Sequence, residues 1–206
     1  MKRDAPAPPV RCVAHTYLPT RWGRFHAFGF ERVAGWKLET AIVLTMGKVT
    51  SGAPLVRIHS ECLTGDVFGS QRCDCGEQLN RALRAIAKEG SGIVIYERQE
   101  GRGIGLMAKL KAYELQDQGL DTIDANEILG YEADLRDFVL PANVLRFLGV
   151  TQVRLLTNNP RKVAALEEAG IEVVQRMDCE VDPSPDALSY LLTKKVRMGH
   201  MLQLRL

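Results

Sequence analysis

The chain has 206 residues, of which 46% are hydrophobic and 25% are charged, and its formal net charge is +2. These values are typical of a globular protein with a sizeable core, and they give no global signature of nucleic-acid or membrane binding. No run of about 18 apolar residues occurs, so we expect no membrane-spanning helix. Residues 1–9 are charged and then Ala/Pro-rich. We expect them to form a short disordered tail rather than a secretory signal, before a single domain of residues 10–206 in the cytoplasm.

The first third of the chain is predicted to be rich in strands. Runs of apolar and β-branched residues over residues 10–18, 25–30, 41–46 and 54–59 predict strands, and Pro or Gly residues interrupt them. The last of these strands leads directly to Cys62, so the first clustered cysteine lies at the end of a strand.

Three of the five cysteines lie close together in the sequence, namely Cys62, Cys73 and Cys75. Cysteines clustered in a chain without secretory features indicate a metal rather than a disulfide. Neither Cys12 nor Cys179 has another cysteine or a histidine at ligand spacing, so three thiolates are expected. Three protein ligands leave the fourth position on zinc to water, which predicts an open zinc site and hydrolytic chemistry. The alternative is a zinc ion that only braces the fold, or buried free thiols.

The segment around the cysteine pair predicts the start of a helix. Residues two apart lie about 200° apart on a helix, so Cys73 and Cys75 can share a metal only if their link is not helical. Asp74 is expected to cap a helix, with Glu77 as in a capping box, and Gly90 to end it. The dipole at this helix N-terminus would favour thiolates.

A buried-type strand over residues 92–96 is followed by a charged, glycine-rich loop over residues 97–105 and a helix over residues 106–118. This order is typical of phosphate-binding sites, although the loop matches neither the Walker nor the dinucleotide-binding motif. The polar segment 121–137 is interpreted as an irregular site loop. The predicted elements that follow are a helix from Pro141, a strand over residues 153–157, a helix over residues 160–169, a strand over residues 171–174 and a terminal helix over residues 186–197.

These elements predict a mixed α/β fold, with a β-rich N-terminal third and then strand–loop–helix units whose helices flank a mixed sheet. The turn over residues 157–162 lies between a strand end and a helix start, where ligands bind in open α/β sheets. Three thiolates would leave a zinc site at a net charge of −1, which works against ionising its water. We expect Arg57, Arg72 and Arg102 to offset this charge.

Together, these motifs resemble the GTP cyclohydrolase II family. The resemblance covers nearly the whole chain, from about residue 10 to about residue 202. The matching motifs are Ser60-Glu-Cys-Leu-Thr-Gly-Asp66, Arg72-Cys-Asp-Cys75, Arg98-Gln-Glu-Gly-Arg102 with Ile104-Gly-Leu106, Leu115-Gln-Asp117 and Leu156-Thr-Asn-Asn-Pro160.

The resemblance implies the first step of riboflavin synthesis, with Zn²⁺ at the three cysteines and Mg²⁺ with the triphosphate. In this reaction GTP gives 2,5-diamino-6-(5-phosphoribosylamino)pyrimidin-4(3H)-one, formate and pyrophosphate. It also implies a homodimer with GTP as its small-molecule substrate and no nucleic-acid or membrane partner. The chain length matches the stand-alone form of the family rather than a fusion with a dihydroxybutanone-phosphate synthase.

The resemblance further implies which residues bind GTP. They are Arg57, Ile58, His59, Ser60, Glu61, Gln78, Glu100, Gly101, Arg102, Thr122, Thr157 and Lys162.

Some of these residues have a plainer interpretation. Glu100 suits guanine recognition because a carboxylate accepts two donors, but it could instead form a salt bridge with Arg98 or Arg102. Lys162 could be a surface lysine in the first turn of a helix, and each arginine could be a solvated surface charge. His59 is interpreted as a supporting or core histidine rather than a metal ligand.

The resemblance assigns catalytic roles to Tyr113, Asp134 as proton acceptor and Arg136 as nucleophile. From spacing alone, Tyr113 could be a core aromatic residue in line with Leu106 and Leu110. A guanidinium with a pKa above about 12 is a poor nucleophile, so Arg136 could instead stabilise the phosphate that is cleaved. Asp134 and Arg136 could also form a pair that braces their loop.

Three other functions compete with the full reaction. A variant enzyme would open the guanine ring and retain the formyl group, giving a formamidopyrimidine nucleotide. A degenerate homologue would bind GTP without turnover, as a sensor. A zinc module for nucleic acid would show paired Cys-x-x-Cys knuckles and a basic face, and the sequence shows neither.

Overall fold

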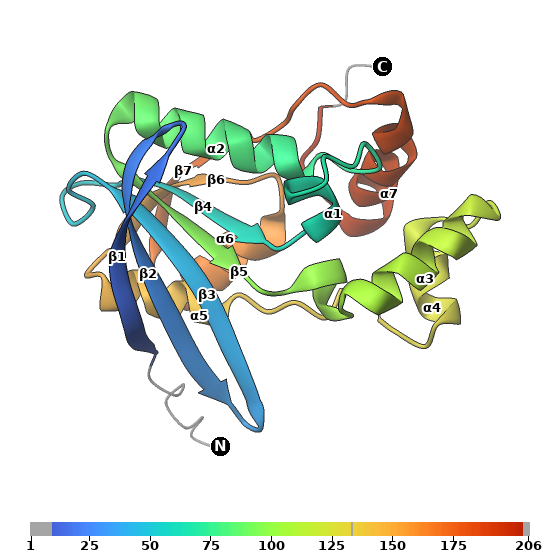
Figure 1. The fold of residues 1–206 in the computed structure, drawn as a ribbon, viewed down its shortest axis with the longest axis horizontal. Helices are drawn as coiled ribbons and strands as arrows, with labels where there is room; N and C mark the ends of the chain where they lie inside the picture. Colours follow the sequence, from blue (N-terminus) through green and yellow to red (C-terminus); the bar gives the residue numbers. More distant parts are fainter. Residues whose placement is uncertain (1–9, 133, 204–206) are drawn as a thin grey trace.

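The computed structural model describes residues 10–132 and 134–203, and a seven-stranded mixed sheet forms the centre of this part of the chain (Figure 1). The order across the sheet is β1-β2-β3-β5-β4-β6-β7. β1, β2, β3 and β5 are antiparallel neighbours, whereas β5, β4, β6 and β7 run parallel to one another. The strands are β1 (Arg11–Thr20), β2 (Gly23–Ala34), β3 (Lys37–Met46), β4 (Leu55–Ser60), β5 (Gly92–Glu97), β6 (Gln152–Leu156) and β7 (Glu172–Met177).

Helices cover both faces of the parallel part of the sheet. They are α1 (Leu63–Asp66), α2 (Cys75–Glu89), α3 (Leu106–Asp117), α4 (Thr122–Ile128), α5 (Val139–Phe147), α6 (Pro160–Glu168) and α7 (Leu188–Met198), with short 3₁₀ turns η1 (Glu100–Gly103) and η2 (Pro185–Ala187). α2 packs its apolar stripe on one face, where Ile86 meets Leu55 and Val94. α5 and α6 bury Leu145 and Leu166 on the other face. None of the described helices is long and apolar enough to cross a membrane.

The carboxyl ends of β4 and β5 lie side by side, with Ser60 paired to Glu97. The loops that follow these strands therefore meet at one edge of the sheet, where ligands bind in α/β proteins. α3, α4 and α7 lie beyond this edge (Figure 1). The sheet thus brings the cysteine segment, the glycine-rich loop and the C-terminal helix to one place.

The predicted mixed α/β class is confirmed, but two local predictions were wrong and one short helix was missed. β2 is twice the predicted length, because it pairs with β3 as far as the Ala34–Lys37 hairpin, whose turn contains Gly35 at φ 63°. Segment 121–137 was predicted to be irregular, yet residues 122–128 form α4. α1 was not predicted, because it is only four residues long.

A helix as short as α4 gives little periodic signal, and it begins where the Asp121 carboxylate accepts hydrogen bonds from the backbone N–H groups of Ile123 (2.7 Å) and Asp124 (3.0 Å). The predicted tail of residues 1–9 lies outside the described residues, and the single-domain assignment stays a prediction.

Candidate active site

Cys62 follows β4 directly, and the Asp66 carboxylate fixes the turn that carries it. This carboxylate accepts hydrogen bonds from the Cys62 backbone N–H (3.0 Å) and the Tyr96 hydroxyl (2.8 Å), and it pairs with His59 Nε2 (3.1 Å). His59 is 2% exposed, and its burial lowers its pKa. His59 therefore helps to hold the Asp66 carboxylate, which fixes the turn that carries Cys62.

The three clustered cysteines converge in space. The Sγ atoms of Cys62, Cys73 and Cys75 all lie within 4.8 Å of one another. Gly65 in α1 allows this approach, because a Cβ there would lie 3.0 Å from Cys73 Sγ and 3.3 Å from Cys62 Sγ. Gly76 is equally constrained, since its Cβ would lie 2.3 Å from the Gly65 carbonyl oxygen. The two glycines let α1 and α2 pack closely around the thiols.

This cluster could hold a metal ion. Cys62 Sγ lies 3.6 Å from Cys73 Sγ, close to the separation of about 3.8 Å between sulfurs on a tetrahedral ion with Zn–S bonds of about 2.3 Å. Hydrogen bonds from the Cys73 and Cys75 thiols, and the nearby Lys109, hold the pKa of Cys62 well below its usual value. In the described part of the chain no fourth His, Cys or carboxylate joins the cluster, so a bound ion would keep an open position.

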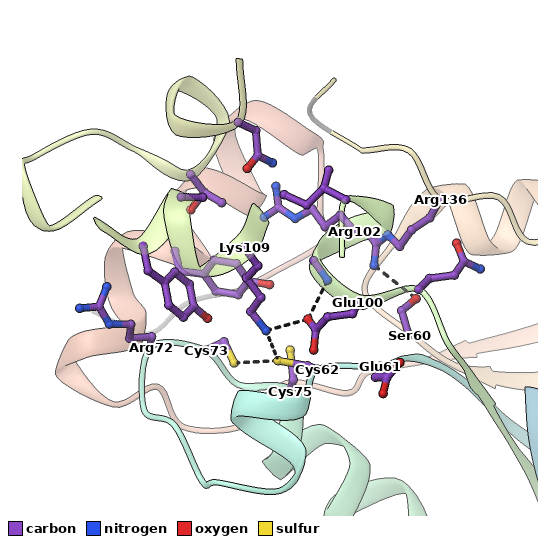
Figure 2. A pocket seen from close by; sticks show the side chains of 18 of the residues that line it. Ser60, Glu61, Cys62, Arg72, Cys73, Cys75, Glu100, Arg102, Lys109 and Arg136 are labelled. Carbon is purple, nitrogen blue, oxygen red and sulfur yellow. Dashed lines mark hydrogen bonds and ion pairs between the residues drawn. The ribbon is translucent and has the colours of Figure 1, made fainter. Parts of the chain in front are cut away.

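Lys109 on α3 is a site residue that the sequence analysis missed. Its Nζ donates to Cys62 Sγ (3.1 Å) and to Glu100 Oε1 (2.8 Å), as Figure 2 shows. Burial alone would lower the pKa of Lys109, but the Cys62 sulfur and Glu100 raise it well above its usual value. The one available signal was its position one helical turn before Tyr113, which places both side chains on the same helix face.

The basic group in direct contact with a thiol is therefore Lys109 and none of the three arginines expected to offset the charge, whose contribution stays a prediction. Arg72 and Arg102 line the same cavity as the thiols, but neither donates to a sulfur, and Arg57 lies in a second cavity. Lys109 takes this role because α3 crosses the site just after the glycine-rich loop.

Glu100 uses both carboxylate oxygens within the protein. Oε1 accepts from the Gly101 backbone N–H (2.7 Å) and from Lys109, and Oε2 accepts from the Leu63 backbone N–H (2.6 Å). The expected salt-bridge alternatives were Arg98 and Arg102, yet the observed partner is Lys109. Oε2 keeps a lone pair for a ligand, because each carboxylate oxygen can accept two hydrogen bonds.

Tyr113 faces the thiol cluster rather than the core. Its hydroxyl lies 3.5 Å from Thr64 Oγ1, and its ring lies 5.0 Å from the Arg72 guanidinium carbon. Burial raises the pKa of Tyr113, so the hydroxyl stays protonated. The core interpretation also required Leu110 to be buried, and this side chain is 42% exposed.

Arg102 is held in an unusual conformation at the same cavity. Among the described residues it is the non-glycine residue with positive φ (60°), a region that side chains adopt at a cost and often at functional sites. Its guanidinium is buried, both terminal nitrogens lack a partner among the described residues, and it lies 5.5 Å from the Tyr190 ring. These two donors are available to a ligand.

Asp134 is enclosed by arginines. Its carboxylate accepts from Arg136 Nε and Nη2 (2.8 Å each) and pairs with Arg161 (2.8 Å). Burial alone would raise the pKa of Asp134, but Arg136 and Arg161 hold it below its usual value. This geometry matches the bracing pair that was considered as an alternative, and a role for Asp134 as proton acceptor stays a prediction.

Two adjoining cavities contain most of the predicted site residues. We call the first the thiol cavity. Its lining includes Ser60, Glu61, Cys62, Cys73, Cys75, Glu100, Gly101, Arg102, Lys109, Tyr113, Thr122, Arg136 and Tyr190.

We call the second the cationic cavity. Ser60, Cys75, Arg136 and Tyr190 line both cavities, which shows that they adjoin. The lining of the cationic cavity also includes Arg57, His59, Asp74, Gln78, Thr157, Asn158, Asn159, Lys162, Lys194, His200 and Leu202.

In the cationic cavity, two of the basic side chains are bound by neutral groups. Arg57 donates to Gln78 Oε1 (2.7 Å) and to the Leu156 carbonyl (3.0 Å), and Lys162 donates to the Ile58 carbonyl (2.8 Å). Burial and the nearby arginines lower the pKa of Lys162 well below its usual value. Arg57 and Lys162 thus have no carboxylate partner among the described residues, whereas Lys194 in the same cavity pairs with Asp74.

Three side chains differ from their predictions in position or in contacts. Ile58 is fully buried in the core of the sheet and lines neither cavity, and Asp134 also lies outside both linings. Asp74 occupies the N-cap position of α2 as expected, but its carboxylate binds Gln78 and Lys194 rather than a backbone N–H of the first turn.

Comparison with known proteins identifies the family. The sequence profile described as GTP cyclohydrolase II matches residues 11–178. A protein named GTP cyclohydrolase-2 from Hahella chejuensis is 53% identical over 194 residues, which is 94% of this chain and 93% of that protein. Riboflavin biosynthesis protein RibBA from Bacillus cereus is 52% identical over 192 residues, which is 93% of this chain and 48% of that protein. The chain thus spans about half the length of the RibBA relatives that it matches.

Among solved structures, a two-domain 3,4-dihydroxy-2-butanone 4-phosphate synthase, RibBX from A. baumannii, matches with a TM-score of 0.41 and 18% identity, over 75% of this chain and 35% of that chain. The site has three thiols that could hold a metal beside a cavity lined by several basic side chains, which suits a hydrolase. The chain belongs to the GTP cyclohydrolase II family, as its motifs predicted.

Proposed function

We propose that this protein hydrolyses GTP to 2,5-diamino-6-(5-phosphoribosylamino)pyrimidin-4(3H)-one, formate and pyrophosphate, as the first step of riboflavin synthesis. The observation that supports this proposal most strongly is that two cavities of different character adjoin. Three thiols that could hold a metal open onto the same space as Glu100 and Tyr113, and this space adjoins a cavity rich in positive charge. A purine nucleoside triphosphate has two parts that would match this site, a nucleoside for the first cavity and a triphosphate for the second.

The proposed cofactors are Zn²⁺ at the three cysteines and Mg²⁺ with the triphosphate. A zinc ion with one open position supplies a Lewis acid and an activated water for attack on the imidazole ring of guanine. Lys109 balances the negative charge that the thiolates leave on the site, and its contact with Cys62 Sγ supports this role.

The base and the ribose would occupy the thiol cavity. Glu100 would accept hydrogen bonds from guanine through the lone pair that remains on Oε2, since its other contacts fix the orientation of the carboxylate. Tyr113 would donate its hydroxyl hydrogen bond to the opening ring, because its raised pKa keeps the proton in place. Thr122, Gly101 and Arg102 would complete this pocket.

The triphosphate would extend into the cationic cavity. Arg57 and Lys162 would bind its oxygens, together with Thr157, Gln78 and the backbone near Ser60. Arg136 lines both cavities, so it would stabilise the phosphate at which pyrophosphate departs. Its bonds to Asp134 position the guanidinium for this, and they support an electrostatic role rather than nucleophilic attack.

The decisive experiment incubates the purified protein, loaded with zinc and magnesium, with GTP. We expect formate and pyrophosphate release in equal amounts, with the deformylated pyrimidine identified by mass spectrometry. Cys75→Ser should lose zinc and formate release together. A product that retains the formyl group would replace the proposal with the ring-opening variant, and GTP binding without any product would indicate a sensor.

The assembly and the compartment are also proposals. We propose a cytoplasmic homodimer that binds neither nucleic acid nor membrane. Exposed apolar side chains on the β2–β3 hairpin support self-association, among them Val33, Trp36 and Leu38. Sedimentation equilibrium tests this directly, and a monomer at micromolar concentration would contradict it.

A further inference from the structure

The C-terminal helix α7 lies beyond residues 11–178, which the family profile matches, yet it forms part of the site wall. Tyr190 and Lys194 of α7, and His200 just after it, line the cationic cavity. The segment is anchored there, because the Met201 backbone N–H donates to the Asn158 carbonyl (2.9 Å). Leu202 and Leu191 pack into a small apolar cluster beneath it.

Lys194 adds positive charge to a cavity that already has an excess of it. The cavity lining contains four Lys and Arg side chains, those of Arg57, Arg136, Lys162 and Lys194. Carboxylates pair with Arg136 (Asp134) and with Lys194 (Asp74), whereas Arg57 and Lys162 form no salt bridge within the described residues. Lys194 Nζ lies 3.1 Å from Asp74 Oδ1 and 4.1 Å from the centre of the Tyr190 ring, and the residue is only 9% exposed. Buried charges are costly unless they are paired, so the unpaired basic groups of this cavity indicate a place for an anion.

Unpartnered nitrogen atoms in the same lining point to the same kind of ligand. Arg57 Nε and Asn158 Nδ2 are buried donors and have no hydrogen-bond partner among the described residues. Their residues are 5% and 4% exposed. Buried polar groups are nearly always partnered, so these nitrogens indicate a place for a molecule with several acceptor oxygens.

We propose that α7 and His200 complete a polyphosphate-binding site in the cationic cavity, with Lys194 as a direct ligand of the phosphate oxygens. In the free protein, the Asp74 carboxylate pairs with Lys194 and holds it in place. When the phosphate chain binds, its oxygens replace this carboxylate as the negative partner of Lys194. This rests on the proposed function in that the natural ligand is the triphosphate of the nucleotide. It goes further by assigning binding residues to the C-terminal segment.

The test measures binding of inorganic tripolyphosphate to the zinc-loaded full chain by isothermal titration calorimetry. A charge-assisted hydrogen bond in a buried site corresponds to about tenfold or more in affinity. We therefore expect Lys194→Met to weaken tripolyphosphate binding by at least about tenfold and His200→Gln to weaken it less. Lys195→Met is the matched control, because it removes the same charge from an exposed position on the same helix and should leave the affinity within about twofold.

Affinities of Lys194→Met and His200→Gln equal to that of the wild type would overturn the proposal. If Lys194→Met does not fold, as judged by its melting temperature and zinc content, His200→Gln alone decides in the same way. Equal weakening by Lys195→Met would also overturn it, since the effect would then be one of net charge.

A parallel assay of formate release from GTP by the wild type separates this proposal from the proposed function. Tripolyphosphate binding that depends on Lys194 in a protein without formate release would support the site and refute the GTP reaction. Formate release from GTP, combined with tripolyphosphate binding that does not depend on Lys194, would support the GTP reaction and refute the role of Lys194.

Discussion

The thiol cavity and the cationic cavity share lining residues but differ in how their charged side chains are partnered. In the thiol cavity, Lys109 lies between Cys62 and Glu100, so the charges are matched within the protein. In the cationic cavity, Arg57 and Lys162 bind only neutral oxygens. The first arrangement suits the proposed metal ion and the guanine base. The second suits the proposed phosphate groups, which would supply negative charge.

The largest expected effect comes from breaking the thiol cluster. We expect Cys73→Ser to lose bound zinc and to reduce formate release from GTP by more than about 10³-fold, because the activated water depends on the metal. Metal content by mass spectrometry and formate by a coupled assay measure both effects. Cys12→Ser is the control, since this thiol lies on β1 and bonds only to the Ala14 carbonyl. Turnover by Cys73→Ser at the rate of the control would show that the cluster is structural.

Removing the internal counter-charge should have the next largest effect. Lys109→Met leaves the Cys62 sulfur and the Glu100 carboxylate without their shared cation, and breaking a buried pair in this way costs about 3–5 kcal/mol. We expect kcat to fall by about 10²-fold and zinc to bind less tightly. Lys111→Met on the exposed face of α3 is the matched control. If both variants behave alike in steady-state kinetics and zinc titration, Lys109 does not balance the thiolates.

A smaller effect should follow from removing one hydroxyl of the thiol cavity. Tyr113→Phe keeps the ring beside Arg72 and loses only the donor, so we expect kcat to fall by about 10- to 100-fold with little change in KM. Stopped assays with product analysis measure both constants. Tyr131→Phe, at a position that is 37% exposed, should match the wild type. An unchanged kcat in Tyr113→Phe would restore the interpretation of Tyr113 as a packing residue.

The smallest expected effect concerns stability behind the cationic cavity. Glu97 at the end of β5 is fully buried, and burial raises its pKa to about 8, against the opposing influence of Lys162. Its carboxyl group favours the folded state below the ordinary pKa near 4.5, and this contribution is lost as the pH rises toward 8. Glu97→Gln cannot ionise, so it should gain free energy of unfolding relative to the wild type between pH 5 and pH 8, on the order of 1–3 kcal/mol.

Urea denaturation at pH 5, 6.5 and 8 measures this difference. A constant offset between Glu97→Gln and the wild type across the three pH values would show that Glu97 is ionised throughout. It would also mean that the positive charge near Lys162 is balanced inside the protein, which would remove the contrast between the two cavities.

The sequence predicted the thiol cavity better than the cationic cavity, for physical reasons. Cys62, Cys73 and Cys75 are rare residues at a spacing that few roles explain, and the strand before Cys62 and the helix that begins at Cys75 follow from local patterns. Lys109 could not be assigned in this way, because lysines are common on helices and its partner Cys62 lies on a different element. Lys194 and His200 are separated from Arg57 by most of the chain, and only the packing of α7 beside Asn158 brings them together.

The fold shows the same limit. Strong apolar runs such as residues 92–96 form strands as predicted, and the mixed sheet was predicted from these runs. The extended β2–β3 hairpin depends on cross-strand pairing around Gly35, and α4 depends on a single capping residue, Asp121. Neither feature leaves a periodic pattern long enough to recognise in the sequence.

The most direct test of the division between the two cavities compares Cys73→Ser and Lys194→Met side by side. Zinc content and tripolyphosphate affinity are measured for each variant. We expect Cys73→Ser to lose zinc but bind tripolyphosphate like the wild type, since Cys73 does not line the cationic cavity, and Lys194→Met to show the opposite pattern. Loss of both properties in both variants would contradict two separate cavities and show a single site that cannot be divided.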